Sequence, residues 1–201
     1  MSQDATFKNY VLNYYSKTEK TYLEYAIDEC SIKTVEVLAK NKAILGYKNK
    51  YTKEILNLYI ENLGCYLEKN ADKCLIPAFV LLIENDYFRL RPTLLEKLNC
   101  YSDVLLDWYI VIQPVVKALI KKGLKVEKSI INITGEKNNY LLEVCKRENQ
   151  YTNEENKEHQ KAIRNYIQFL KQEVVDFETE IDGKRPINLL SSVFQKKIRG
   201  K

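Results

Sequence analysis

Length, composition and charge describe a folded chain and exclude several classes of protein. The 201 residues are 45% apolar and 29% charged, with a formal net charge of +5, which is not the balance of a disordered chain. No stretch approaches the roughly 18 consecutive apolar residues of a membrane span. The N-terminus lacks the basic start and apolar core of a signal peptide. Since glycine and proline are also scarce, we expect a helix-rich cytoplasmic protein.

The residues that carry metal or catalytic chemistry are few and scattered. His159 is the only histidine, and it lies in a polar stretch where we expect a solvated helix residue. No glycine-rich phosphate loop or Gly-x-Ser-x-Gly segment is present. A zinc site needs clustered ligands, so we predict free thiols, no metal, no cofactor and no catalytic residue. The widely spaced cysteines are Cys30, Cys65, Cys74, Cys100 and Cys145.

In chain order, the first predicted element is an N-terminal capping helix within residues 1–20, which carries an apolar stripe at helical spacing. Residues 22–27 and 32–43 then predict a helix hairpin. Ala26 is the small position in this hairpin, and Val35, Val37 and Leu38 would pack the second helix. Neither helix can bury its apolar face alone, so the pattern predicts a stack of such pairs.

The middle of the chain is helical but irregular. Residues 46–53 predict an extended connection, and 54–62 predict another first helix, whose Leu56 follows Leu23 by 33 residues. Residues 75–83 are apolar on all sides and predict a buried helix entered through Pro77. A further helix is expected over 91–98, but between 63 and 101 no repeat can be assigned.

The pairing returns after residue 102. A first helix contains Trp108, and a second begins at Pro114 and ends at Gly123, because proline suits a helix start and glycine its end. Residues 127–138 predict an extended finger around Gly135. Then come a helix over 139–149, an exposed loop over 150–157 and a helix over 162–170.

The C-terminal part predicts a tight turn and one more repeat. Glu173 stands where a helix-ending glycine is usual, and residues 174–181 lead into a turn at Asp182-Gly183. A last helix is expected from Pro186 to Val193. The tail, 194–201, is basic, and we expect it to fray.

Three of these segments resemble ankyrin repeats. Arg185-Pro186-Ile187-Asn188 occupies the place of the family's Thr-Pro-Leu-His segment, residues 22–43 match a repeat without a gap, and residues 119–123 match the end of a second helix. The resemblance covers 21–62 and 102–193. It implies an all-α, ankyrin-type solenoid in a single repeat domain, 1–201, with a capping helix and an irregular middle. An irregular all-α domain is the alternative fold.

The resemblance implies a non-catalytic scaffold that binds another protein through finger tips and the exposed ends of first helices. The high content of Lys, Asn, Ile and Tyr is typical of AT-rich genomes. If the source is a pathogen, the resemblance to the family implies a host protein as the partner and the host cytoplasm as the location. We expect Tyr47, Tyr109 and Arg147 to anchor the partner. The candidate partner-binding residues are Asp28, Glu29, Tyr47, Lys48, Asn49, Tyr109, Ile110, Arg147 and Glu148.

Two other functions are compatible with the sequence. A basic all-α protein could bind nucleic acid through a patch formed by Lys117, Lys121, Lys122, Lys125 and Lys128. The chain could also be an inactive or regulatory subunit of a larger helical assembly. The 27 acidic residues are interspersed with the 32 basic ones, which disfavours nucleic acid relative to a protein partner.

Overall fold

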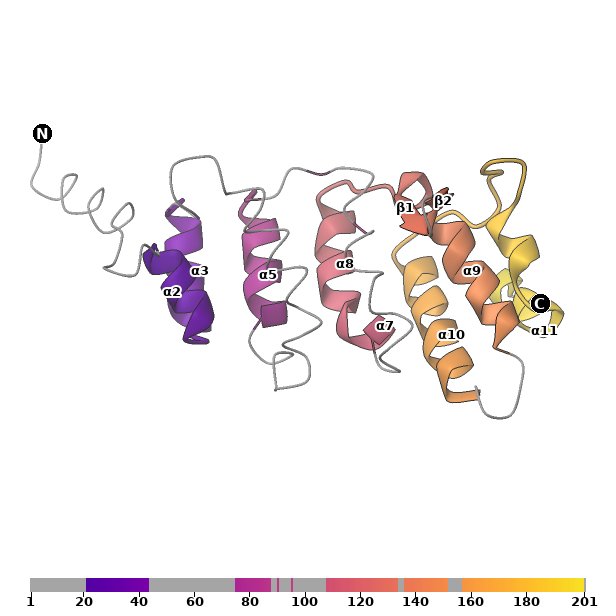
Figure 1. Ribbon diagram of the computed structural model, residues 1–201, viewed down its shortest axis with the longest axis horizontal. Coiled ribbons are helices and arrows are strands. Elements are labelled where there is room, and N and C mark those ends of the chain that lie inside the picture. Colours follow the sequence, from indigo (N-terminus) through magenta and orange to yellow (C-terminus); the bar gives the residue numbers. More distant parts are fainter. Residues whose placement is uncertain are drawn as a thin grey trace, which may run out of the picture. The chain divides into compact units, whose positions relative to one another are not determined.

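The computed structural model describes residues 21–43, 75–87, 90, 95, 108–133, 136–151 and 157–200 (Figure 1). The chain divides into two compact units, 1–89 and 90–201, which are described separately below as unit 1 and unit 2. Most of the described residues are helical, as predicted, although a small two-stranded sheet makes the fold not purely α. The predicted capping helix, the connection at 46–53 and the helix at 54–62 lie outside the described residues. None of the helices described is long and apolar enough to cross a membrane.

Unit 1 contains the predicted helix hairpin. Helix α2, Tyr22–Asp28, begins at a capping box in which Glu24 N donates to Thr21 Oγ1 (3.1 Å) and Thr21 N donates to Glu24 Oε2 (2.7 Å). Each bond satisfies a main-chain N–H that the first turn leaves without a partner. Helix α3, Ile32–Lys40, follows after a short loop, and the two helices pack against each other.

The buried face of α3 differs from the prediction at one position. Val35 and Leu38 are buried, but Val37 is 60% exposed. The reason is helical geometry, since a residue two places from Val35 points toward the other side of the helix. Helix α5, Leu75–Glu84, packs against α3 with Pro77 near its start. It is buried on one side, through Phe79 and Leu82 among others, rather than all round.

Unit 2 alternates helices with short hairpins. Antiparallel strands β1 and β2 form the predicted finger, with Ile130 opposite Asn139 and Ile133 opposite Glu136. The main-chain N–H of Tyr140 donates to Ser129 O (2.9 Å) and closes the base of this hairpin. The elements are α7 Trp108–Val111, α8 Gln113–Lys121, η2 Val126–Lys128, β1 Ile130–Ile133, β2 Glu136–Asn139, α9 Tyr140–Gln150, α10 Lys157–Gln172, η4 Pro186–Leu189 and α11 Ser192–Arg199.

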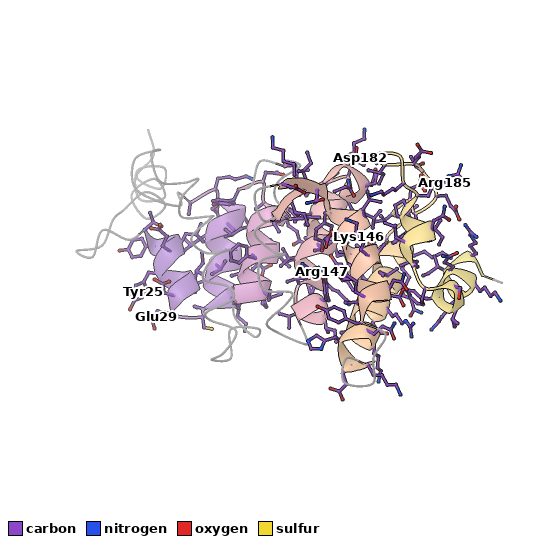
Figure 2. The ribbon with its side chains drawn as sticks, turned by 45° about the vertical axis from the view of Figure 1, so that its right-hand side comes forward. Tyr25, Glu29, Lys146, Arg147, Asp182 and Arg185 are labelled. Atoms are coloured by element: carbon purple, nitrogen blue, oxygen red, sulfur yellow. The ribbon has the colours of Figure 1, made fainter. Side chains whose placement is uncertain are left out.

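The predicted turn at Asp182-Gly183 is a second, smaller hairpin. Ile181 and Lys184 exchange main-chain hydrogen bonds of 2.7 and 2.9 Å. Asp182 and Gly183 both have positive φ, +50° and +73°, as the tight turn of a hairpin requires. This hairpin and β1–β2 lie at the same end of α10 (Figures 1 and 2).

The C-terminal prediction was wrong in two respects. The helix that begins at Pro186 is a single 3-10 turn, η4, and a separate α-helix, α11, follows it. The tail does not fray up to Gly200, because Phe194 and Ile198, one helical turn apart, are buried. Helix α11 contacts both α10 and η4.

The helices α3, α5, α8 and α10 all end with the same main-chain arrangement. A residue with left-handed φ follows each helix after one cap residue: Lys42, Asp86, Gly123 and Val174, with φ of +56°, +62°, +98° and +64°. The N–H of the next residue donates to the carbonyl five places earlier, which is a leucine each time: Leu38, Leu82, Leu119 and Leu170. All four leucines are buried, as expected of a helix end that carries an apolar contact.

These helix ends correct the sequence interpretation. The left-handed residue after α10 is Val174, not Glu173. Residues 82–87 (LIENDY) are equivalent to 38–43 (LAKNKA), 119–124 (LIKKGL) and 170–175 (LKQEVV). Helix α5 therefore belongs to the same class as the other three, inside a region where no repeat could be assigned.

Candidate functional site

The structure separates the candidate partner-binding residues into exposed and buried groups. Asp28 and Glu29 are exposed at the end of α2, and Ile110 on α7 is 46% exposed. Tyr47, Lys48 and Asn49 lie outside the described residues. The expected exposure was wrong for the remaining three: Tyr109, Arg147 and Glu148 are 3%, 8% and 0% exposed.

Tyr109 and Arg147 belong to a buried polar cluster in unit 2. The Tyr109 ring lies 5.0 Å from that of Tyr166, centroid to centroid, and Arg147 Nη1 donates to Tyr109 OH over 3.5 Å. Tyr140 OH and Tyr166 OH are 2.8 Å apart. Burial raises the pKa of both Tyr140 and Tyr166 well above the usual value for tyrosine. The cluster joins α7, α9 and α10. Because it is buried, it does not present a surface for a partner in this structure.

Glu148 is a buried carboxylate that joins three segments. Its Oε1 accepts from Arg164 Nε on α10 (2.7 Å) and from Ser191 Oγ (2.9 Å), and its Oε2 accepts from Ser191 N (2.8 Å). Gln160 Nε2 also donates to the main-chain carbonyl of Glu148 (3.0 Å). Arg164 also lies over the Phe194 ring, 5.4 Å from its centroid. The network therefore holds the η4–α11 segment against α9 and α10.

Helical periodicity shows why these residues were misplaced. The end of α9 is rich in charged residues, and charged side chains are rarely buried unless they are paired. Their partners come from α7, α10 and the segment before α11, which are distant in the sequence. Only the regular spacing of Tyr140, Val144 and Arg147 on one helix face could have indicated that the buried side of α9 reaches its C-terminal end.

The lysine patch of the alternative function is partly neutralised. Lys117 Nζ lies 2.5 Å from Glu173 Oε1, which ties α8 to the end of α10. Lys121, Lys122, Lys125 and Lys128 are exposed.

The cysteines and the histidine differ from the predictions in detail. Within the described ranges no group of three His, Cys, Asp or Glu residues gathers as metal ligands would. Cys145 is a free, buried thiol, and burial raises its pKa. Cys30, in contrast, is disulfide-bonded. His159 is half-buried and stacks on Tyr151, with ring centroids 5.5 Å apart, rather than being fully solvated.

The described residues define a mostly helical protein with a small two-stranded sheet in unit 2. Comparisons with protein-family models, with curated proteins and with solved structures found no significant match.

Proposed function

We propose that the chain is a divergent ankyrin-type repeat protein and that its function is to bind another protein without catalysing a reaction. The observation that carries this proposal is the common ending of α3, α5, α8 and α10. Each of these ends has the same three parts in the same order. A buried leucine comes first, a residue with left-handed φ comes four places later, and the main-chain N–H of the next residue donates to the leucine carbonyl. Such recurrence is expected of a repeat protein, in which each helix pair is a similar unit.

The segments after α8 and α10 support the same proposal. Two buried residues, Leu124 and Val126, lie one and three places after Gly123. The residues one and three places after Val174, which are Val175 and Phe177, are also buried. A hairpin follows each time, and the helical turn after the hairpin bonds back to a residue that precedes it. The two bonds are Tyr140 N to Ser129 O (2.9 Å) and Ile187 N to Phe177 O (3.0 Å).

Side chains also connect these helices within each unit. In unit 1, Lys42 Nζ donates to the main-chain carbonyl of Asn85, and Tyr87 OH donates to Ala43 O (2.5 Å). In unit 2, the Lys117–Glu173 ion pair joins α8 to the end of α10. Helices that end in the same way and are joined by such side-chain contacts are the expected neighbours in a stack.

The partner would bind to first helices and finger tips. Among the candidates, Asp28, Glu29 and Ile110 are exposed, and Tyr47, Lys48 and Asn49 remain candidates outside the described residues. Arg185, exposed beside the Asp182-Gly183 turn (Figure 2), is an additional candidate. We propose the cytoplasm as the location, or the host cytoplasm for a pathogen protein.

Affinity capture from a lysate of the source organism, or of its host, followed by mass spectrometry, tests the proposal. It is run at low and high salt, with nuclease added. Capture of one protein that is retained at high salt would support the protein-binding function. The Ile110→Glu variant should no longer capture this protein, whereas the matched Val37→Glu variant should still capture it. Recovery of nucleic acid alone, abolished by salt or by Lys121→Glu/Lys122→Glu, would replace the scaffold with the nucleic-acid alternative.

A further inference from the structure

The exposed side of α2 combines an aromatic ring with a carboxylate. Tyr25 is 52% exposed, and Glu29 follows it by one helical turn at the C-cap. Residues four apart share a helix face, and Figure 2 shows both side chains on the outward side of α2. The Glu29 carboxylate has no cation within ion-pair distance among the described residues. This face, called the acidic face, is therefore both apolar and negatively charged.

The exposed side of α11 has the opposite charge. Val193 is 76% exposed, and the exposed Lys196 and Lys197 follow it by three and four residues, about one helical turn along α11. The neighbouring Arg199 is neutralised by Glu178, with Nε and Oε1 3.2 Å apart. The two lysines have no carboxylate partner in the part of the chain that the structure describes. This face, called the basic face, is apolar and positively charged.

From these two faces we propose that copies of the chain associate head to tail, with the basic face of one copy on the acidic face of the next. Each face offers an exposed apolar residue together with the charge that the other face lacks. Contact would bury Tyr25 and Val193, and pairing of Glu29 with Lys196 or Lys197 would set the orientation. Contacts between two acidic or two basic faces would bring like charges together.

A second copy is the occupant that fits these faces because each face lacks the charge that the other carries, and both faces belong to the same chain. A contact between two different surfaces leaves one of each unused at the ends of the assembly, so further copies can add. The expected product is a short open chain of copies or a closed ring.

Sedimentation velocity of the full chain over a wide concentration range tests this inference, at low and at high salt. We expect the average mass to rise with concentration and to fall as salt is added. Lys196→Glu/Lys197→Glu and, separately, Glu29→Lys should each weaken association by at least about tenfold. Lys121→Glu/Lys122→Glu, with the same change in net charge, and Glu180→Lys are the matched controls and should associate as the unmodified chain does.

Combining Glu29→Lys with Lys196→Glu/Lys197→Glu in one chain exchanges the two charges and should restore association. Circular dichroism checks that each variant is folded, and Lys196→Gln/Lys197→Gln replaces the reversal if α11 is disturbed. A chain that stays monomeric throughout would overturn the inference and assign the acidic face to another occupant. Association that persists in the single reversals, or that is not restored in the combined variant, would also overturn it.

Discussion

The hydroxyl oxygens of Tyr140 and Tyr166 lie 2.8 Å apart with neither side chain accessible to solvent. One hydroxyl must donate to the other, and the pair crosses from α9 to α10. A buried polar group that loses its partner costs more than the bond itself contributes. This asymmetry makes the pair a sensitive probe of the interior of unit 2.

We expect Tyr166→Phe to lower the free energy of unfolding by about 1–3 kcal/mol, because Tyr140 would retain a buried hydroxyl without this partner. The double variant Tyr140→Phe/Tyr166→Phe should lose less than the sum of the two single losses. Urea unfolding of the four proteins in this cycle measures the coupling. Additive losses would show that the hydroxyls do not interact.

Removal of the Glu148 carboxylate should release the C-terminal segment. We expect Glu148→Ala to cost about 3–5 kcal/mol, since a buried charge network loses its common acceptor. The loss should appear first as faster amide exchange in residues 186–199, while α8 is less affected. Ser191→Ala, which removes one of the bonds, should cost about 1 kcal/mol. Equal protection of α11 in the Glu148→Ala variant and the unmodified chain would contradict this role.

The left-handed positions offer a matched pair of substitutions. Val174 is β-branched and has a φ of +64°, whereas Gly123 occupies the equivalent place after α8 with a φ of +98°. We expect Val174→Gly to raise the free energy of unfolding by about 1 kcal/mol and Gly123→Val to lower it by a similar amount. A Cβ at Gly123 would meet no atom within 4 Å, so a clash of the Cβ does not account for a loss there, and main-chain strain is its expected cause. Thermal unfolding of both variants checks the two signs.

The loop before the second hairpin should respond to acid. Donation from the Thr179 hydroxyl, and from the main-chain N–H groups of Glu178 and Thr179, lowers the pKa of Asp176. A carboxyl whose pKa is lower in the folded state stabilises that state above its unfolded pKa, and the effect is lost as the pH falls through the folded pKa. NMR titration should give Asp176 a pKa below the usual value, and Thr179→Val should move it upward. An unchanged pKa in Thr179→Val would exclude the hydroxyl as the main cause.

The sequence predicted the helices whose starts and ends are marked by neighbouring residues. Pro114 and Gly123 mark the start and end of α8, and apolar residues around the small Ala26 mark the α2–α3 hairpin. The Asp182-Gly183 turn was also found, because two adjacent residues that tolerate positive φ have few other uses. These signals depend on the main chain and on neighbouring residues only.

The sequence could not reveal contacts made over long distances. In the sequence Glu148 is typical of a surface residue, because its partners Arg164 and Ser191 are distant along the chain. Tyr109 was predicted to anchor a partner, because Tyr166, which it contacts, is also distant along the chain. The basic tail resembled a fraying end because its lysines outnumber its apolar residues. Two of those apolar residues, Phe194 and Ile198, nevertheless have a buried surface to pack on.

The four equivalent helix ends differ in how much each position can vary. The left-handed residue is lysine, aspartate, glycine or valine and is exposed in every case. The leucine four places before it does not change. A glycine is therefore not required at the left-handed position for a helix to end in this way. A pattern that fixes this leucine and an apolar or aromatic residue five places later, and ignores the left-handed position, describes all four helix ends, whereas a pattern that requires the glycine describes only the end of α8.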